Sequence, residues 1–336
     1  MEILDNIYDT DSQSETDSQP AQEEQQEEQQ EEQQEQEQEQ EQEQQETMTM
    51  EEIDERLARD GYVVVPNVLT SQEVAEYRIE FFNWLKGTDG LEEFHSRFSG
   101  NGIFKYFEVA HQRFAWLART NPKIINIFKY IWRTDDVVTS FDGCCYYPKE
   151  YSDEPRLWIH TDQSSQKVGR HCVQSFVSFT ENKERTLVLY RGSQHLHQDY
   201  FNITNTVTQN DWCVLNPRYL DGLDYRQEIL HVKPGSLVLW DSRVFHQNTC
   251  GNPECSEERL VQYLCYLPRN HPKNTEEENQ TRRECFRQRI NTSHWPYPLR
   301  PIHKQPSYHG QQVYIEYDGL SAPKIDDLLD KIDAIL

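Results

Sequence analysis

The sequence predicts a mainly β fold with flanking helices, in which two antiparallel sheets face each other as a sandwich or barrel. Two observations lead to this fold class. Helical patterns with recognisable start signals are concentrated before residue 133. From Val137 onward, short segments rich in Val, Tyr, Phe, Thr and Leu alternate with clusters of turn residues. Helices therefore come first along the chain, and strands follow.

Two helix starts are readable in the first part of the chain. Thr70 and Glu73 have the spacing of a capping box, in which both side chains satisfy free backbone N–H groups. They predict a helix of about 16 residues that runs to Lys86. Asn121 followed by Pro122 predicts a second helix, whose apolar positions repeat with helical spacing.

The strand candidates are numerous enough to form two facing sheets. They are 62–66, 137–147, 157–160, 172–180, 186–190, 228–232, 236–240 and 260–267. Further helices are expected at 276–289 and 325–335, within an extension that begins at about residue 270.

Residues 1–49 are predicted to be a disordered acidic Glu/Gln-rich tail. Residues 1–50 hold 18 acidic side chains and no Lys or Arg, and 22–46 contain only Glu and Gln. Such a segment has too little apolar surface to offset its ordering entropy. The tail is expected to be a solvated extension, with binding to an unknown protein partner as the functional alternative. Residues 50–336 are expected to form a single domain.

Composition limits the function classes. The net charge of −25 leaves −7 for the chain after residue 50, which disfavours non-specific nucleic-acid binding. No apolar run is long enough for a membrane span, and no signal peptide is readable. Eight Cys are too sparse for a secreted disulfide scaffold. We therefore expect a soluble intracellular protein, cytoplasmic by default, with reduced thiols and no nucleic-acid partner. The arginines between 282 and 300 are interpreted as a solvated helix face.

Two His and one Asp form the candidate metal site. His160 and Asp162 follow the apolar run 157–159 with the period of a strand, so they share one face. His246 follows the segment 234–242, which reads as a turn, a strand and then a loop. Two imidazoles and a carboxylate on a β scaffold are typical of a facial triad that binds Fe(II) and leaves positions open.

Arg259 is the candidate anchor for an anionic cosubstrate. It opens the strand 260–267 and is expected to point into the barrel, where a guanidinium needs an anion. A carboxylate of 2-oxoglutarate would pair with it bidentately. The alternative is an ion pair with Glu257, Glu258 or another acid of the chain. Arg243 is the rival anchor, but its position three residues before His246 predicts that it faces the other way.

Four separated segments resemble the phytanoyl-CoA dioxygenase-like branch of the Fe(II)/2-oxoglutarate-dependent oxygenases. They are DGYVVVPNVLTSQEV (60–74), HTD (160–162), SFTENKERTLVLYRGSQHLH (178–197) and KPGSLVLWDSRVFHQN (233–248) with Arg259. They occur in the family's order and together span roughly residues 55–270. This joint match is far more specific than any one segment.

The resemblance implies a double-stranded β-helix core of the jelly-roll or cupin-like type. It implies Fe(II) on His160, Asp162 and His246, with 2-oxoglutarate on Arg259. The family commonly has a small hydroxyl residue two positions after the second His. Asn248 occupies that position here, so Thr249 is predicted to replace the contact with 2-oxoglutarate.

The activity that the resemblance implies is hydroxylation of a small organic substrate, acyl-CoA-like or another metabolite. O₂ is consumed, succinate and CO₂ are released, and ascorbate supports the reaction. The competing hypothesis is a non-catalytic double-stranded β-helix that binds a partner and retains the metal site.

Overall fold

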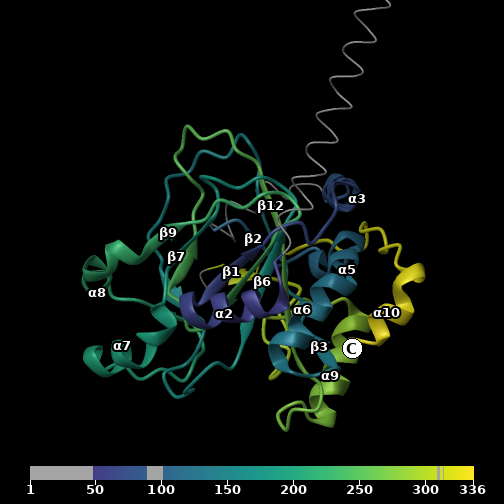
Figure 1. The fold of residues 1–336 in the computed structure, drawn as a ribbon. Coiled ribbons are helices and arrows are strands. Elements are labelled where there is room, and N and C mark those ends of the chain that lie inside the picture. Colours follow the sequence, from purple (N-terminus) through teal and green to yellow (C-terminus); the bar gives the residue numbers. More distant parts are fainter. Residues whose placement is uncertain (1–47, 89–100, 309–310, 313) are drawn as a thin grey trace, which may run out of the picture. The chain divides into compact units, whose positions relative to one another are not determined.

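The larger of two facing antiparallel sheets is covered by helices on its outer face, and the smaller sheet closes the other side, as in a jelly roll (Figure 1). The computed structural model describes residues 48–88, 101–308, 311–312 and 314–336. The predicted disordered tail therefore lies outside the described residues, except for its last two positions. The double-stranded β-helix expected from the sequence is confirmed.

Both main sheets are wholly antiparallel, and their strands are not in chain order. The larger sheet has the order β1 (Tyr62–Val65), β10 (Leu237–Asp241), β6 (Val173–Ser178), β12 (Arg259–Pro268), β4 (Cys144–Tyr147) and β2 (Ile103–Phe104), with β3 (Val137–Thr139) also pairing with β12. The smaller sheet has the order β8 (Cys213–Val214), β5 (His160–Thr161), β11 (His246–Asn248), β7 (Leu187–Tyr190) and β9 (Gln227–Ile229). A separate pair joins β13 (Ser307–Tyr308) to β14 (Gln311–Gln312).

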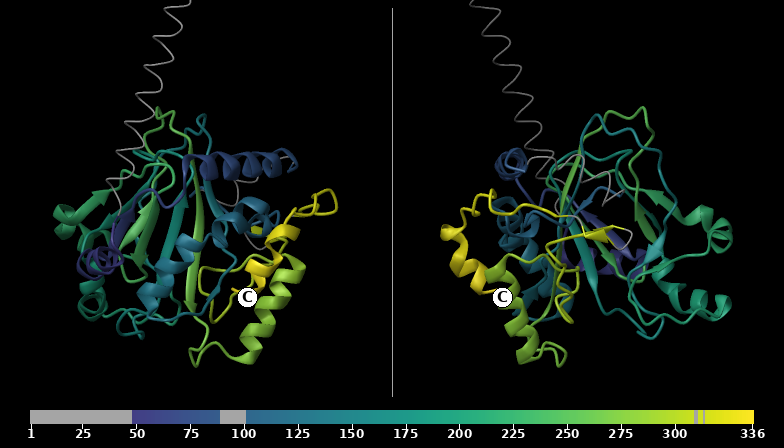
Figure 2. Two further views of the ribbon diagram at one scale, coloured as in Figure 1. Left: turned by 45° about the vertical axis from the view of Figure 1, so that its right-hand side comes forward. Right: turned by 180° about the vertical axis from the view of Figure 1, so that it is seen from behind.

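The helices lie on both sides of these sheets. They are α2 (Met50–Asp60), α3 (Ser71–Lys86), α5 (Arg113–Arg119), α6 (Pro122–Trp132), α7 (His197–Thr204), α8 (Pro217–Leu220), α9 (Glu276–Gln288) and α10 (Leu329–Asp333). The views of Figures 1 and 2 place α5, α6, α9 and α10 on the side of the larger sheet, and α7 and α8 on the opposite side, beside the smaller sheet. None of the helices in the described part of the chain is long and apolar enough to cross a membrane.

Strand β10 shows how the core is divided. Leu237 and Leu239 face the helices and pack in the same cluster as residues of α3 and α6. Val238 and Trp240 point the other way, into the space between the sheets, where they join Leu189 of β7. Because both faces are covered, this antiparallel strand is a continuous apolar run rather than an alternating one.

The structure corrects several element boundaries. The segment 137–147, predicted as one strand, is interrupted at residues 140–143, so that β3 and β4 pair with different parts of β12. His246 lies in β11 rather than in a loop. The helices α5, α7 and α8 were not predicted, because tertiary contacts stabilise such short elements.

The solvated helix face predicted for the arginines of the C-terminal extension is confirmed for Arg283 and Arg287, which are exposed. It is wrong for Arg282, which is fully buried and donates hydrogen bonds to Asn274, Asn279 and the Pro296 carbonyl. Arg282 thus joins separate parts of the extension. Arg289 pairs with the buried Glu108 at 3.0 Å and connects the extension to the preceding part of the domain.

Replacing Thr70 with Ala is expected to lower the free energy of unfolding by about 1 kcal/mol. The Thr70 hydroxyl accepts from the Glu73 N–H at 3.2 Å, and the Glu73 carboxylate accepts from the Thr70 N–H at 2.8 Å. Urea denaturation measures the loss. Thr70→Ser keeps the hydroxyl and should behave as the unmodified chain; equal destabilisation by both variants would contradict the capping role.

Deleting residues 1–47 is expected to leave the melting temperature and turnover nearly unchanged, because the Glu/Gln tract offers no apolar stripe for packing. The deletion should end at Thr47, since Thr49 caps α2 and Met48 packs against the core. Removing residues 48 and 49 as well should cost about 1 kcal/mol through the lost cap. A large effect of the shorter deletion would mean that the tract docks on the domain.

Candidate active site

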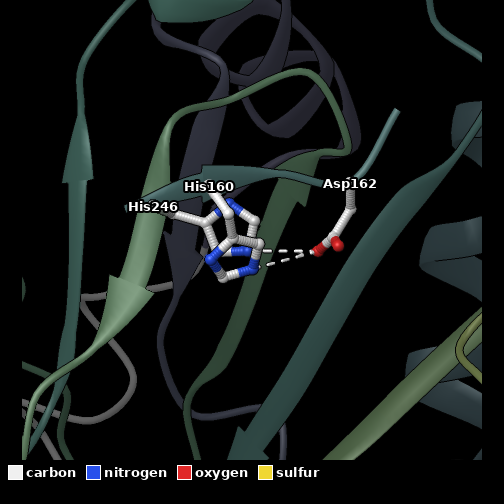
Figure 3. Close-up of side chains that lie close together, drawn as sticks. All are labelled: His160, Asp162 and His246. Carbon is white, nitrogen blue, oxygen red and sulfur yellow. Dashed lines mark ion pairs between the residues drawn. The ribbon is translucent and has the colours of Figure 1, made fainter. Parts of the chain in front are cut away.

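The structure brings His160, Asp162 and His246 together at the smaller sheet. His160 and His246 are directly opposite each other in the pairing of β5 with β11. Figure 3 shows both imidazoles pointing toward the Asp162 carboxylate. Asp162 Oδ2 lies 3.5 Å from His160 Nε2 and 3.4 Å from His246 Nε2. Among the described residues, these three form the one group of His, Cys, Asp or Glu side chains placed to share a metal ion.

Backbone carbonyls orient both imidazoles in the same way. His160 Nδ1 lies 3.1 Å from the Trp158 carbonyl oxygen, and His246 Nδ1 lies 2.9 Å from that of Val244. A carbonyl only accepts, so each Nδ1 carries a proton, and in the neutral form of each imidazole the Nε2 atom keeps its lone pair for a metal ion. Sequence reasoning did not identify these acceptors, which set the tautomer that a metal ligand requires.

The Asp162 carboxylate is held in its ionised form. Burial alone would raise its pKa, but the neighbouring His160 and His246 imidazoles hold the pKa of Asp162 well below its usual range. Gln174 Nε2 donates to Asp162 Oδ2 at 3.0 Å, and the Asp162 N–H donates to the Ser242 carbonyl. Burial lowers the pKa of His246, which keeps this imidazole neutral. An ionised Asp162 and a neutral His246 are the forms in which a carboxylate and an imidazole bind a metal ion.

Arg259 lies at the start of β12 with no anionic partner among the described residues. Its side chain is fully buried, its Nη2 donates to Asn248 Oδ1 at 3.1 Å, and its guanidinium lies over the Phe176 ring at 5.3 Å. Its Nε and Nη1 atoms have no hydrogen-bond partner. A buried cation with two unsatisfied donors is costly, and a carboxylate supplied by a ligand would satisfy both.

The acids proposed as alternative partners of Arg259 are engaged elsewhere. Glu258 pairs with Arg78 at 2.6 Å, and Glu257 accepts from backbone N–H groups of 183–185. The rival anchor Arg243 pairs with Asp241 at 2.7 Å. Arg259 is thus a buried arginine without an acidic partner among the described residues, and it is connected to the cavity through Asn248.

Position 248, rather than 249, connects the Arg259 guanidinium to the site. Asn248 donates from Nδ2 to the Tyr263 hydroxyl at 2.6 Å, in addition to accepting from Arg259. The Thr249 hydroxyl instead accepts from the Gly251 N–H at 3.2 Å. Asn248 and Tyr263 were missed as site residues, although Tyr263 shares a strand face with Arg259 in the sequence pattern.

A cavity of about 530 Å³ opens over the triad, a volume typical of small-molecule sites. Its described lining includes all three triad residues together with Asn248 and Tyr263. The remaining wall includes four Trp side chains among polar and aliphatic residues, and part of it comes from 292–302, in the C-terminal extension. A role at the substrate entrance was predicted for this extension only as the alternative interpretation of the arginines between 282 and 300.

Comparison with known proteins agrees with this arrangement. The model of the phytanoyl-CoA dioxygenase family matches residues 57–249, more than half of the chain. A curated relative, "Ava biosynthesis cluster protein O" of Aspergillus versicolor, is 26% identical over 271 residues, which cover 71% of this chain and 84% of the relative.

Several solved structures are similar to the chain at low sequence identity. The epimerase SnoN, in complex with Fe³⁺, alpha ketoglutarate and nogalamycin RO, is 20% identical with a TM-score of 0.46, over 65% of this chain and 83% of SnoN. EctD from S. alaskensis, with 2-oxoglutarate and 5-hydroxyectoine, is 17% identical with a TM-score of 0.45, over 64% and 74%. HygX from Streptomyces hygroscopicus, with nickel and 2-oxoglutarate, is 16% identical with a TM-score of 0.43, over 66% and 88%.

Proposed function

The chain belongs to the phytanoyl-CoA dioxygenase family of Fe(II)- and 2-oxoglutarate-dependent oxygenases, and on that premise we propose that it hydroxylates a small organic substrate. His160, Asp162 and His246 hold Fe(II) in this proposal, and Arg259 binds 2-oxoglutarate. The observation that carries it is the convergence of the three ligand atoms within 4.8 Å of one another.

Arg259 supports the presence of a dianionic cosubstrate. Its Nε and Nη1 atoms have donors available for a carboxylate, and Asn248 and Phe176 fix the plane of the guanidinium. Thr249 remains a predicted contact of 2-oxoglutarate. Its hydroxyl would have to exchange the Gly251 N–H for the ligand.

The reactive groups are supplied by the bound iron, 2-oxoglutarate and O₂, whose overall reaction inserts one oxygen atom into a substrate C–H bond and releases succinate and CO₂. The side chains and backbone of the protein orient the metal ligands and shield the reacting atoms from water. The Trp158 and Val244 carbonyls fix the imidazoles, and Gln174 fixes the carboxylate. The buried walls exclude water from the reacting atoms.

The substrate side of the proposal has independent support. The cavity volume suits a compact molecule, and the curated relative is described as a biosynthesis cluster protein. Both observations are in keeping with a small-molecule substrate.

Succinate release tests the proposal directly. The full chain is incubated with Fe(II), 2-oxoglutarate, O₂ and ascorbate, with and without a library of small molecules, and succinate is measured. Stimulated release that is absent from a His160→Ala variant is the expected result. Absence of turnover together with absence of 2-oxoglutarate binding in calorimetry would overturn the proposal that the chain is an enzyme. Binding of 2-oxoglutarate without turnover with any substrate would favour the hypothesis of a non-catalytic binding protein.

A further inference from the structure

The turn at residues 140–143 is held in place by buried side chains from other elements. Arg119 Nη2 and Gln262 Nε2 both donate to the Asp142 backbone carbonyl, at 3.1 and 3.3 Å. A Cβ atom on Gly143 would lie 1.7 Å from the Phe104 carbonyl oxygen, so only glycine permits this approach. Two buried polar side chains thus maintain the break in the strand that the sequence predicted over 137–147.

The consequence of this break is the placement of the Asp142 carboxylate. Asp142 lines the cavity that contains the triad. Within the described part of the chain, its carboxylate has no hydrogen bond or ion pair, although its backbone carbonyl has two. Burial raises the pKa of Asp142 to about 7, and the negative charge of Asp162 also raises it. The positive charges of Arg119 and Lys105 lower it, but by less than burial raises it. A half-buried carboxylate without a partner in such a cavity is free to accept a hydrogen bond from a ligand.

The rest of the cavity favours a cation with an aromatic portion. Four indoles contribute to its lining: Trp158, Trp212, Trp240 and Trp295. Aromatic faces attract cations and pack against planar rings. Trp212 is 54% exposed, an unusual exposure for a side chain of this size, and its ring lies 6.0 Å from that of His160.

The positive side chains at the cavity are the groups that would oppose the binding of a cationic ligand. Arg300 and Lys167 share the buried Asp211 as their anionic partner, at 2.9 and 2.7 Å. Burial lowers the pKa of His294 to about 4, so this imidazole is neutral at pH 7. Lys105 is solvent-exposed and has no ion pair with Asp142. Among the described residues, the Asp142 carboxylate therefore has no direct ion pair, although the charges of Arg119 and Lys105 act on it from nearby.

We infer that Asp142 is a substrate-binding residue, and that the substrate is a compact molecule combining an aromatic ring system with a protonated amine or guanidine nitrogen. This inference rests on the proposed function, because it concerns the molecule presented to the same iron site. It disfavours an acyl-CoA, whose phosphates need several free cationic side chains. The cavity of about 530 Å³ is also of the size that encloses a drug-sized molecule.

Binding of matched indole probes tests this inference without turnover. Calorimetry is performed at pH 8 on the full chain with Fe(II) and 2-oxoglutarate, in the absence of O₂. Tryptamine carries an ammonium group, 3-methylindole carries no charge and indole-3-propionate carries a carboxylate. Tryptamine should bind at least about tenfold more tightly than either of the others, the factor expected of one charge-assisted contact. Equal binding of the three probes, or preference for the propionate, would overturn the inference, and this comparison needs no variant.

Two substitutions then assign the preference to Asp142. Asp142→Asn keeps the shape of the side chain and should reduce the tryptamine preference to about onefold, while 3-methylindole binding stays unchanged. Lys105→Met removes a competing cation from the cavity and should strengthen tryptamine binding. Asp153→Asn, at a carboxylate that accepts from Tyr151 and does not line the cavity, is the matched control and should have no effect. A preference that survives Asp142→Asn would contradict the assignment.

The calorimetric experiments distinguish a failure of the proposed function from a failure of the substrate inference. Loss of the proposed function would appear as absent 2-oxoglutarate binding in the unmodified chain, whatever the probes do. Failure of the substrate inference would appear as normal 2-oxoglutarate binding with no discrimination among the three probes.

Discussion

Replacing Arg259 with Met is expected to raise the 2-oxoglutarate concentration needed for half-maximal turnover by roughly 100-fold or more. Removing one partner of a buried ion pair costs about 3–5 kcal/mol, and each 1.4 kcal/mol is a factor of ten. In the proposed complex, the carboxylate of 2-oxoglutarate would lose its only buried cation in the described part of the site. Calorimetric titration of 2-oxoglutarate into the Fe(II)-loaded chain, without O₂, measures the effect separately from turnover.

The same substitution should not destabilise the protein in the absence of 2-oxoglutarate. Arg259 carries two buried donors without partners, and each such group costs about 1–3 kcal/mol. The unfolding free energy of Arg259→Met should therefore equal or exceed that of the unmodified chain, and 2-oxoglutarate should no longer raise its melting temperature. Arg191→Met, at an exposed arginine near Glu228, is the control. Unchanged 2-oxoglutarate affinity in Arg259→Met would remove this residue as the anchor.

Replacing His160 with Ala is expected to abolish turnover and to weaken metal binding by more than about 100-fold. Loss of a contact that only orients a ligand already costs about 10–100-fold, and His160 is proposed to bind the metal itself. Titration with Co(II), followed by its visible absorption, reports binding without requiring catalysis. The unmodified chain should bind one Co(II) ion.

An exposed histidine provides the matched control for this experiment. His231 pairs with Glu181 at 2.9 Å on the surface, so His231→Ala should bind Co(II) like the unmodified chain. Replacement of Asp162 by Ala should reproduce the loss seen with His160→Ala, because Asp162 is the one carboxylate of the three-residue group. Stoichiometric Co(II) binding by both variants would place the metal elsewhere.

Local sequence signals predicted the elements near the start of the domain well. The capping boxes and apolar spacing depend on contacts within one or two helical turns, so the α3 and α6 starts at Ser71 and Pro122 agree with expectation. The triad residues were also found together, because period two places His160 and Asp162 on one face and the family segments include His246. Their roles as ligands remain predictions.

Features that depend on distant partners were not predicted. The strand expected over 137–147 is broken because Arg119 and Gln262, far along the chain, hold the Asp142 carbonyl. Arg282 looked solvent-exposed in a charged segment, yet carbonyl and amide oxygens of other segments surround it. Composition does not reveal such partners, since each is brought close only by the fold.

By itself, the sequence determined the fold class, the starts of α3 and α6, and a short set of candidate site residues, because these follow from periodicity, capping and ordered family segments. Only the tertiary structure decided which carbonyls orient His160 and His246, that Arg259 lacks an internal anion, and that Asp142 lies at the cavity with a free carboxylate. The physical reason is that the energetics of a charged or polar group depend on its burial and its partners. Both are properties of residues far apart in the chain and adjacent in space.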